Sequence, residues 1–368
     1  MAGRRRKSVK ECIRNFTPAW FTVIMGTGVL SALASRFPFG AGSLALEVIS
    51  LLFFFLNLAL FVLFCGITVA RYWLFPEMWR RMLSHPAQSL KPAMVVRWKG
   101  LPLYFVGLLV DGYGNFLPMC FWHAAYYDDN APSLLVQDGV RLGGLLANAL
   151  LKISIHHALI TTGVSLTALV MGLSLALMIL TVYLTRLVLH GPPDVSLILS
   201  AFITLGPLGQ GGFSFLINGE NLSLLLPLHL GNTFPAAALT GELLYSACFC
   251  AAWVLWSMGI AWTAISLISV YAVARKEIIP FALAYWGLIF PTGVFGLLSV
   301  QLGVVLDSPF FKYFGAIWSV IVLVLWIFVS LKTVPAVWNA SIFVAPCLAS
   351  SSLISSEKAV ETAPSEGS

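Results

Sequence analysis

The polar side chains inside the long apolar stretches of this sequence are mostly hydroxyl and amide groups, with almost no carboxylates or bases among them. Glu47 and Glu242 lie near the ends of such stretches. Cation-coupled pumps usually carry buried Asp or Glu, so this pattern suits the passage of a monovalent anion or a weak acid better. The alternative role for each group is a hydrogen bond between helices. The candidate polar contacts are Thr22, Thr27, Gln210 and Thr292.

Glycine and proline interrupt three of the apolar stretches. Proline removes a backbone donor, and irregular backbone at membrane depth is tolerated only inside protein or beside a water-filled cavity. Three interrupted stretches that alternate with smoother ones therefore predict a substrate path, while glycines that only allow close helix packing are the alternative. The predicted path-lining and kink residues are Pro18, Gly26, Thr27, Gly28, Gly206, Pro207, Gly209, Gln210, Gly211, Pro291 and Gly293.

Phe290 directly precedes one of these prolines, Pro291. An aromatic ring that projects into a narrow pore can gate it by blocking and dewetting the path. We therefore consider Phe290 a candidate pore gate. The spacing alone is a weak signal, because the chain has 26 phenylalanines and most of them are expected to face lipid.

Enzymatic and metal-binding chemistry has little support in the sequence. His156 and His157 lie at the start of an apolar stretch, but a membrane enzyme that used them would need further histidines or carboxylates at membrane depth. The six cysteines show no paired spacing, and Cys248 and Cys250 would point to opposite sides of a helix. We expect no catalytic residues, no metal site and no cofactor.

The composition defines the fold class. The 368-residue chain is 59% hydrophobic and 10% charged, whereas soluble domains carry about 25% charged residues. Its apolar runs continue for about 20 residues, enough to span a bilayer as helices, and lack the alternation of a barrel. An all-α polytopic protein embedded in a lipid bilayer is predicted. The net charge of +6 comes from Lys and Arg at the ends of apolar runs, so no nucleic-acid partner is expected.

The placement of Lys and Arg predicts the orientation of the chain. The basic residues before position 15 place the N-terminus in the cytoplasm, and Arg186, Arg275 and Lys276 mark further cytoplasmic ends. Seven spans are predicted at 18–35, 44–70, 158–185, 195–217, 239–271, 279–302 and 311–334.

An eighth span follows from parity. If Arg81 and Arg186 both lie in the cytoplasm, the stretch 82–157 must cross the membrane an odd number of times. Residues 101–122 supply one poor span with Asp111 at its middle, where a charge costs roughly 2.5–3.5 kcal/mol. The simplest count is eight spans with both termini cytoplasmic.

Three regions are expected along the chain. Residues 1–14 form a basic cytoplasmic N-terminus, 15–340 the transmembrane domain, and 341–368 a small, polar tail that is predicted to be disordered. A predicted outer loop after residue 217 contains Asn221-Leu222-Ser223, a glycosylation acceptor pattern.

Four segments, taken together, resemble fungal sulfite efflux pumps of the tellurite-resistance/dicarboxylate transporter superfamily. They are RNFTPAWF with MGTG at 14–28, HPAQSL at 85–90, LGPLGQGGF at 205–213 and YWGLIFPTGVF at 285–295. These segments are long and keep the order that they have in the family. The resemblance covers about 1–90 and 145–340.

The resemblance implies ten spans, built as five helical hairpins with kinked inner helices around a central pore. It also implies a phenylalanine across the pore, directly before a proline in the ninth span, which matches Phe290. Fungal members of this kind export sulfite, a small inorganic anion, across the plasma membrane. Known architectures in the superfamily are homo-oligomers in which each subunit has its own pore.

The segment 91–144 departs from the family pattern. It is too polar and too short for the three spans expected there. We hypothesise that it reflects a wrong reading frame or a mispredicted splice, which transcript reads would test directly. If the segment is genuine, two of the ten helices are missing.

Three other functions remain as alternatives. A dicarboxylate such as malate, carried by relatives in the superfamily, should require cationic residues in the path, and the predicted spans have none near their centres. A membrane-embedded enzyme would use His156 and His157. A seven-span receptor would have an outer N-terminus, contrary to the Arg-rich segment at residues 4–6.

Overall fold

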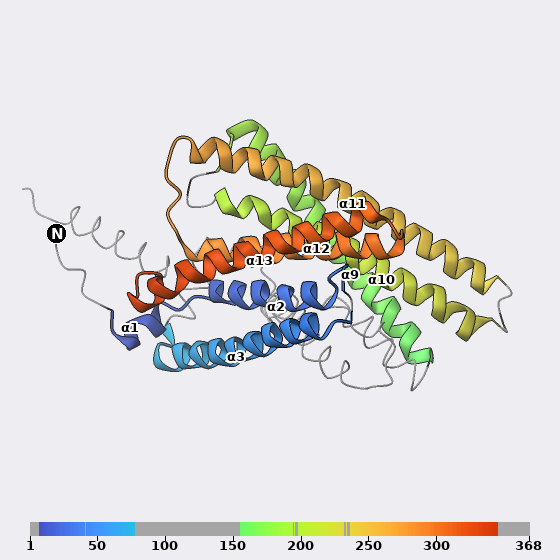
Figure 1. Cartoon of the computed structure of the whole chain (residues 1–368), viewed down its shortest axis with the longest axis horizontal. Helices are drawn as coiled ribbons and strands as arrows, with labels where there is room; N and C mark the ends of the chain where they lie inside the picture. Colours follow the sequence, from blue (N-terminus) through green and yellow to red (C-terminus); the bar gives the residue numbers. More distant parts are fainter. Residues whose placement is uncertain are drawn as a thin grey trace, which may run out of the picture.

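The computed structural model describes residues 7–40, 42–77, 155–193, 195, 198–231, 233 and 236–344. All regular elements in these ranges are helices (Figure 1). The α-helices are α1 (Val9–Arg14), α2 (Phe21–Ser35), α3 (Leu44–Leu74), α9 (Ile155–His190), α10 (Leu205–Leu230), α11 (Ala237–Ala274), α12 (Trp286–Val305) and α13 (Pro309–Trp338). The 3-10 helices are η1 (Pro18–Trp20), η4 (Ile198–Thr204) and η5 (Leu283–Tyr285).

The predicted all-α membrane architecture is confirmed. Six helical segments of the described ranges are long and apolar enough to cross a membrane, and each overlaps a predicted span. The seventh predicted span, 18–35, corresponds to η1 and α2. Because α2 has 15 residues, it is only about 22 Å long and is shorter than the other spans.

Burial divides the helices into an inner and an outer group. In its most apolar window, 83% of the η5–α12 segment and 67% of η4–α10 are buried, against 22% for α3, α11 and α13. The described part of α9 is the most exposed, since only 6% of its most apolar window is buried. α2 is buried along most of its length. We call α2, α10 and α12 the inner helices, and α3, α9, α11 and α13 the outer helices.

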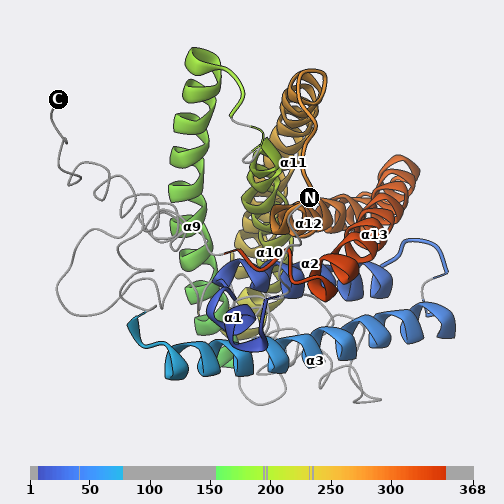
Figure 2. The same cartoon turned by 90° about the vertical axis from the view of Figure 1, so that its left-hand side faces the viewer.

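The inner helices pack side by side in the order α2, α12, α10. Figure 1 shows α2 between α3 and α12, with α13 alongside α12, and Figure 2 shows α9 on the other side of α10 from α13. Each inner helix is followed along the chain by an outer helix, namely α3, α11 and α13. The three pairs are helical hairpins of the kind that the family resemblance implies.

The three inner helices run in the same direction. In the pair α2 and α12, Gly26 lies against Ile289. About one turn further along both helices, Val29 lies against Gly293. The pair α10 and α12 is also parallel, since Gly206 lies against Pro291 and Gly209, three residues later, against the backbone of Phe295. All three inner helices therefore begin at one end of the bundle, and each begins directly after a 3-10 helix.

Tryptophan side chains of the outer helices bind the inner helices. The indole N–H of Trp326 donates to the Thr27 hydroxyl at 3.1 Å, and that of Trp318 donates to the Thr292 carbonyl at 2.7 Å. In the reverse direction, Trp286 of α12 donates to Thr333 of α13 at 2.9 Å. Such bonds fix the rotation of each helix about its axis, since apolar packing in lipid has little directional preference.

The two ends of the described chain meet. The Lys7 ammonium donates to the Phe343 carbonyl at 2.5 Å, and the Phe343 ring stacks on Trp20 at 5.1 Å. Trp20 immediately precedes α2, so both ends lie where the inner helices begin. The placement of the two chain termini in the cytoplasm stays a prediction.

The predicted loop after residue 217 is wrong. α10 continues to Leu230, and Asn221 lies inside it with only 3% of its surface exposed. The polar residues from Asn218 to Asn221 resemble a loop in sequence, but here they occupy the buried interior of a helix. Asn221 is therefore not accessible as a glycosylation acceptor in this fold.

Candidate functional site

Three sides of α12 are occupied by neighbouring helices. One side contacts α2 through Ile289 and Gly293, and another contacts α10 through Phe295. On the third side, Gly296 lies against Trp318 of α13 and Gly303 against the start of α13. These contacts leave one further side of the helix, which holds the candidate gate.

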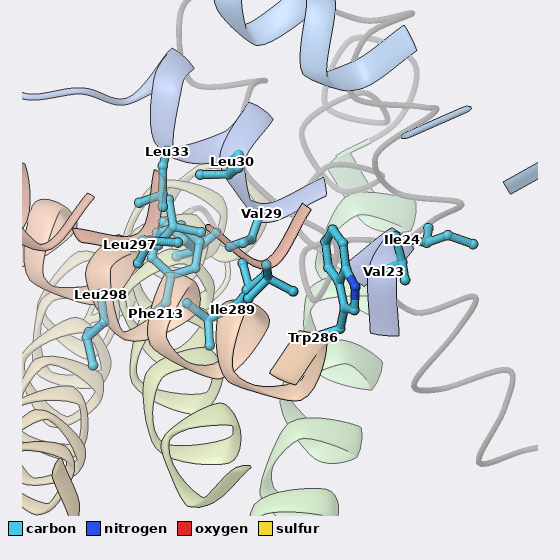
Figure 3. Packing of buried hydrophobic residues seen from close by; sticks show 14 of the residues in the cluster. Val23, Ile24, Val29, Leu30, Leu33, Phe213, Trp286, Ile289, Leu297 and Leu298 are labelled. Atoms are coloured by element: carbon cyan, nitrogen blue, oxygen red, sulfur yellow. The ribbon is translucent and has the colours of Figure 1, made fainter. Parts of the chain in front are cut away.

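The fourth face of α12 carries Phe290, Val294, Leu297 and Gln301. Their spacing of four, three and four residues places them in one row along the helix. Val294 and Leu297 are buried in the main apolar cluster together with Phe213 of α10, and Figure 3 shows Phe213 and Leu297 within this cluster. Gln301 is also buried. The row thus begins at a half-buried ring and ends at a buried amide.

Phe290 itself lies in the first turns of α12 and is half-buried. Its ring packs against the margin of the main apolar cluster. One turn earlier, a Cβ atom added at Gly287 would meet no atom of the described residues within 4 Å. Pro291 has no N–H, which leaves the carbonyl of Gly287 without its intrahelical partner. Phe290 and a carbonyl that lacks its α-helical hydrogen bond therefore both lie in the first turns of α12.

The three predicted proline kinks have different structural settings. Pro18 begins η1, and Pro207 lies in the first turn of α10, where a missing N–H costs little. Of the three, only Pro291 interrupts a helix interior. The irregular backbone thus lies mostly at the 3-10 segments before the inner helices, and two helix-interior prolines, Pro227 and Pro335, were not identified from the sequence.

The predicted glycines lie at helix contacts. A Cβ atom at Gly209 would lie 2.6 Å from the backbone N of Phe295, and one at Gly293 would lie 2.5 Å from Val29. Contacts are looser at Gly26 and Gly211, where the nearest atoms would be 3.1 and 3.2 Å away, and ordinary at Gly206, at 3.9 Å. These short distances favour close helix packing as the role of the glycines. Gly28 is also buried.

Three of the four predicted polar contacts donate hydrogen bonds to backbone carbonyls. The hydroxyls of Thr22, Thr27 and Thr292 donate to the carbonyls three or four residues earlier. Thr27 also accepts the bond from Trp326, which is a hydrogen bond between helices. Gln210 is half-buried on α10. A path-lining role for these four residues stays a prediction.

Arg36 is a functional candidate that the sequence reading missed, because it lies one residue beyond the predicted span 18–35. Its Nη1 donates to Oε1 of Gln301 at 2.8 Å, and its guanidinium carbon lies 5.2 Å from the ring centroid of Phe213. The three residues belong to α10, α12 and the end of α2. We call Arg36, Phe213 and Gln301 the arginine cluster.

Gln210 belongs to a polar row along α10 whose other members were missed from the sequence. Gln210, Ser214, Asn218 and Asn221 recur every three or four residues, and the last three are buried. The Asn218 amide donates to the Ser214 carbonyl at 3.0 Å. Because Gly209 of the same helix faces α12, helical spacing puts Asn218 on the opposite side. The signal in the sequence was the spacing of amides, which was read as a loop.

Several predicted features lie outside the described residues. The poor span 101–122 and the segment 91–144 are not described, and neither are the tail residues beyond 344. His156 and His157 belong to the first turn of α9, but their side chains are not described. By contrast, Arg71 is described: it directly follows the predicted span 44–70, lies in the last turn of α3 and is 1% exposed.

Comparison with known proteins agrees with this architecture. A sulfite efflux pump of Arthroderma benhamiae is 29% identical over 90% of this chain and 93% of its own length, and one from Trichophyton rubrum gives the same values. An uncharacterized transporter of Methanocaldococcus jannaschii is 28% identical over 91% of this chain and 98% of its own.

The sequence model of the voltage-dependent anion channel family matches residues 15–127 and 130–334. The match includes most of the segment 91–144, so the predicted interruption of the resemblance over that whole segment is wrong. The reading-frame hypothesis itself remains a prediction. The matched residues include all three inner helices, the candidate gate and the arginine cluster. This chain is a multi-pass membrane protein that belongs to the voltage-dependent anion channel family.

Proposed function

We propose that this chain is an anion transporter that exports sulfite from the cell. The observation that carries the proposal is the likeness to fungal sulfite efflux pumps along 90% of the chain, within a family of anion channels. The path would run along the fourth face of α12, with Phe290 as its gate. The activity is transport, with a small inorganic anion as substrate, rather than catalysis.

The charge distribution of the inner helices supports an anionic substrate. α2 and α12 contain no acidic residue, and α10 contains one, Glu220. All three inner helices begin at the same end, and a helix N-terminus carries about half a positive charge. Anions would therefore be attracted to the end at which these helices begin. The nearest cation at the opposite end of α2 is Arg36.

The orientation is proposed from the basic residues. Arg14 precedes η1 and α2, Arg186 lies near the end of α9, and Arg275 follows α11 directly. Since each position comes before an inner helix, the parallel inner helices put these cations at one end of the bundle. By the positive-inside rule this end faces the cytoplasm, in the plasma membrane, and anions enter there for export.

A homo-oligomer is also proposed, with one path per subunit. The outer helices α3, α11 and α13 have large exposed apolar side chains along their length, among them Leu52, Val254 and Phe328. Lipid chains or a second copy of the chain can cover such a surface. Because the inner helices are already buried within one subunit, the path requires no residue from a partner.

Malate is the second candidate substrate, and Arg36 is the observation that favours it. A dicarboxylate requires cationic groups, and this cation contacts two inner helices. A single cationic side chain also suits sulfite, whereas the two carboxylates of malate would require a second cation. The inner helices α2, α10 and α12 contain no Lys or Arg.

Transport by purified protein in liposomes distinguishes the two substrates. We expect sulfite to enter protein-containing vesicles at least about tenfold faster than malate, a difference in barrier of about 1.4 kcal/mol. Vesicles without protein provide the background rate. Malate uptake without sulfite uptake would move the chain to the dicarboxylate branch, and no uptake of either would refute transport.

A further inference from the structure

Arg36 is held in a fixed orientation between the inner helices. Gln301 accepts a hydrogen bond on one edge of the guanidinium at 2.8 Å, and the Phe213 ring lies 5.2 Å from its central carbon. Both partners are almost fully buried, at 4% and 2% exposed. Arg36 itself is half-buried. A planar guanidinium fixed in this way loses little further freedom when it binds a ligand.

The depth of Arg36 argues against a simple surface cation. Gln301 precedes the end of α12 by four residues, so its partner Arg36 lies about one helical turn inside the end of that helix. A cation at the C-terminus of α2 is also stabilised by the helix dipole. The dipole, however, does not account for the contacts with α10 and α12. Ionisable residues at membrane depth commonly mark ion pathways.

The arginine cluster and the candidate gate share one face of α12. Phe290 and Gln301 are eleven residues apart, which is three helical turns, and their side chains leave the helix in nearly the same direction. They are separated by about 16 Å along the axis. An anion that passes Phe290 along this face would next reach Arg36 at the far end of the inner helices.

We propose that Arg36 binds the transported oxyanion at this far end, with Gln301 and Phe213 as positioning residues. This inference rests on the proposed function, because it assigns a binding group to the same path. The ligand class is a small oxyanion such as sulfite, whose oxygens match the paired N–H groups of a guanidinium. Binding at the exit would raise the affinity of the path and favour anions over cations.

The first test replaces the charge at Arg36. For Arg36→Gln in liposomes we expect the KM for sulfite to rise at least about tenfold, because charge-assisted hydrogen bonds to the anion are lost. Arg36→Lys keeps the charge but not the planar guanidinium, so its KM should lie between that of the wild type and that of Arg36→Gln. Lys332→Gln, on the exposed end of α13, is the matched control and should leave KM unchanged.

The second test separates anion binding from a structural role. Gln301→Glu has nearly the same shape and still accepts the bond from Arg36, but its carboxylate neutralises the cation. If Arg36 only stabilises the bundle, this variant should transport with a normal KM and equal or higher thermal stability. If Arg36 binds the anion, KM should rise about as much as in Arg36→Gln, with an unchanged size-exclusion profile.

The outcomes separate this inference from the proposed function. A wild type that moves sulfite, together with a normal KM in Gln301→Glu or in a folded Arg36→Gln, overturns the inference alone. A wild type that moves no sulfite overturns both. If Arg36→Gln fails to fold, Gln301→Glu decides the matter. A sulfite-dependent rise in the melting temperature of the detergent-solubilised wild type, lost in Gln301→Glu, would support anion binding at Arg36.

Discussion

Phe290→Ala is expected to increase the rate of sulfite release on the order of tenfold, which corresponds to a barrier lowered by about 1.4 kcal/mol. The ring is half-buried at the start of α12, next to Pro291 and one turn from Gly287, at which an added Cβ would meet no atom of the described residues within 4 Å. An apolar ring in a narrow path excludes water and ions. Alanine would remove most of the apolar volume without changing any charge.

The control for this prediction is Phe328→Ala, since Phe328 lies on the outer helix α13, is 46% exposed and is separate from the proposed path. Release should not change in that variant. Efflux from preloaded liposomes measures both variants. If Phe290 serves only as packing, Phe290→Ala would lower the melting temperature and leave the rate per folded molecule at the wild-type level, which would contradict a gate at this position.

Gly209→Ala should prevent the inner helices from packing correctly. The new Cβ would lie 2.6 Å from the backbone N of Phe295 and 2.8 Å from the carbonyl carbon of Val294. Because both atoms belong to the backbone of α12, a rotamer change cannot relieve the overlap, and α10 must move away. Overpacking of this kind costs about 1–3 kcal/mol and sometimes more, so we expect a large loss of monodisperse protein.

Gly206→Ala is a close control, one turn earlier on the same helix. Its Cβ would meet the Pro291 ring at 3.9 Å, an ordinary van der Waals distance. Its melting temperature should stay near that of the wild type. Size-exclusion profiles and thermal melts of the detergent-solubilised variants measure the difference. Equal stability of the two variants would contradict the close packing of α10 against α12.

The helices could be predicted from sequence because an apolar run of about 20 residues has few alternatives in a membrane. Reliance on apolar runs also explains why the end of α10 was predicted incorrectly. Asn218, Glu220 and Asn221 lowered the local hydropathy, so a loop was expected where the helix continues to Leu230. A window of hydropathy does not register that these side chains are buried within the protein rather than exposed to lipid.

The candidate site was only partly predictable. Phe290 was identified through its adjacent proline and the family resemblance, and it lies half-buried near the start of α12, packed against the main apolar cluster. Arg36 and Gln301 are 265 residues apart in sequence, and neither has a local pattern that indicates the other. Their contact arises only from the parallel packing of α2 against α12.

Sulfite release from a fungal strain that lacks its own sulfite exporter tests the central claim most directly. Cells that express this chain should release sulfite into the medium and survive sulfite that kills the parent strain, while a tag confirms that the protein reaches the plasma membrane. If the protein is present there and neither release nor survival exceeds that of the parent strain, sulfite export by this chain is contradicted.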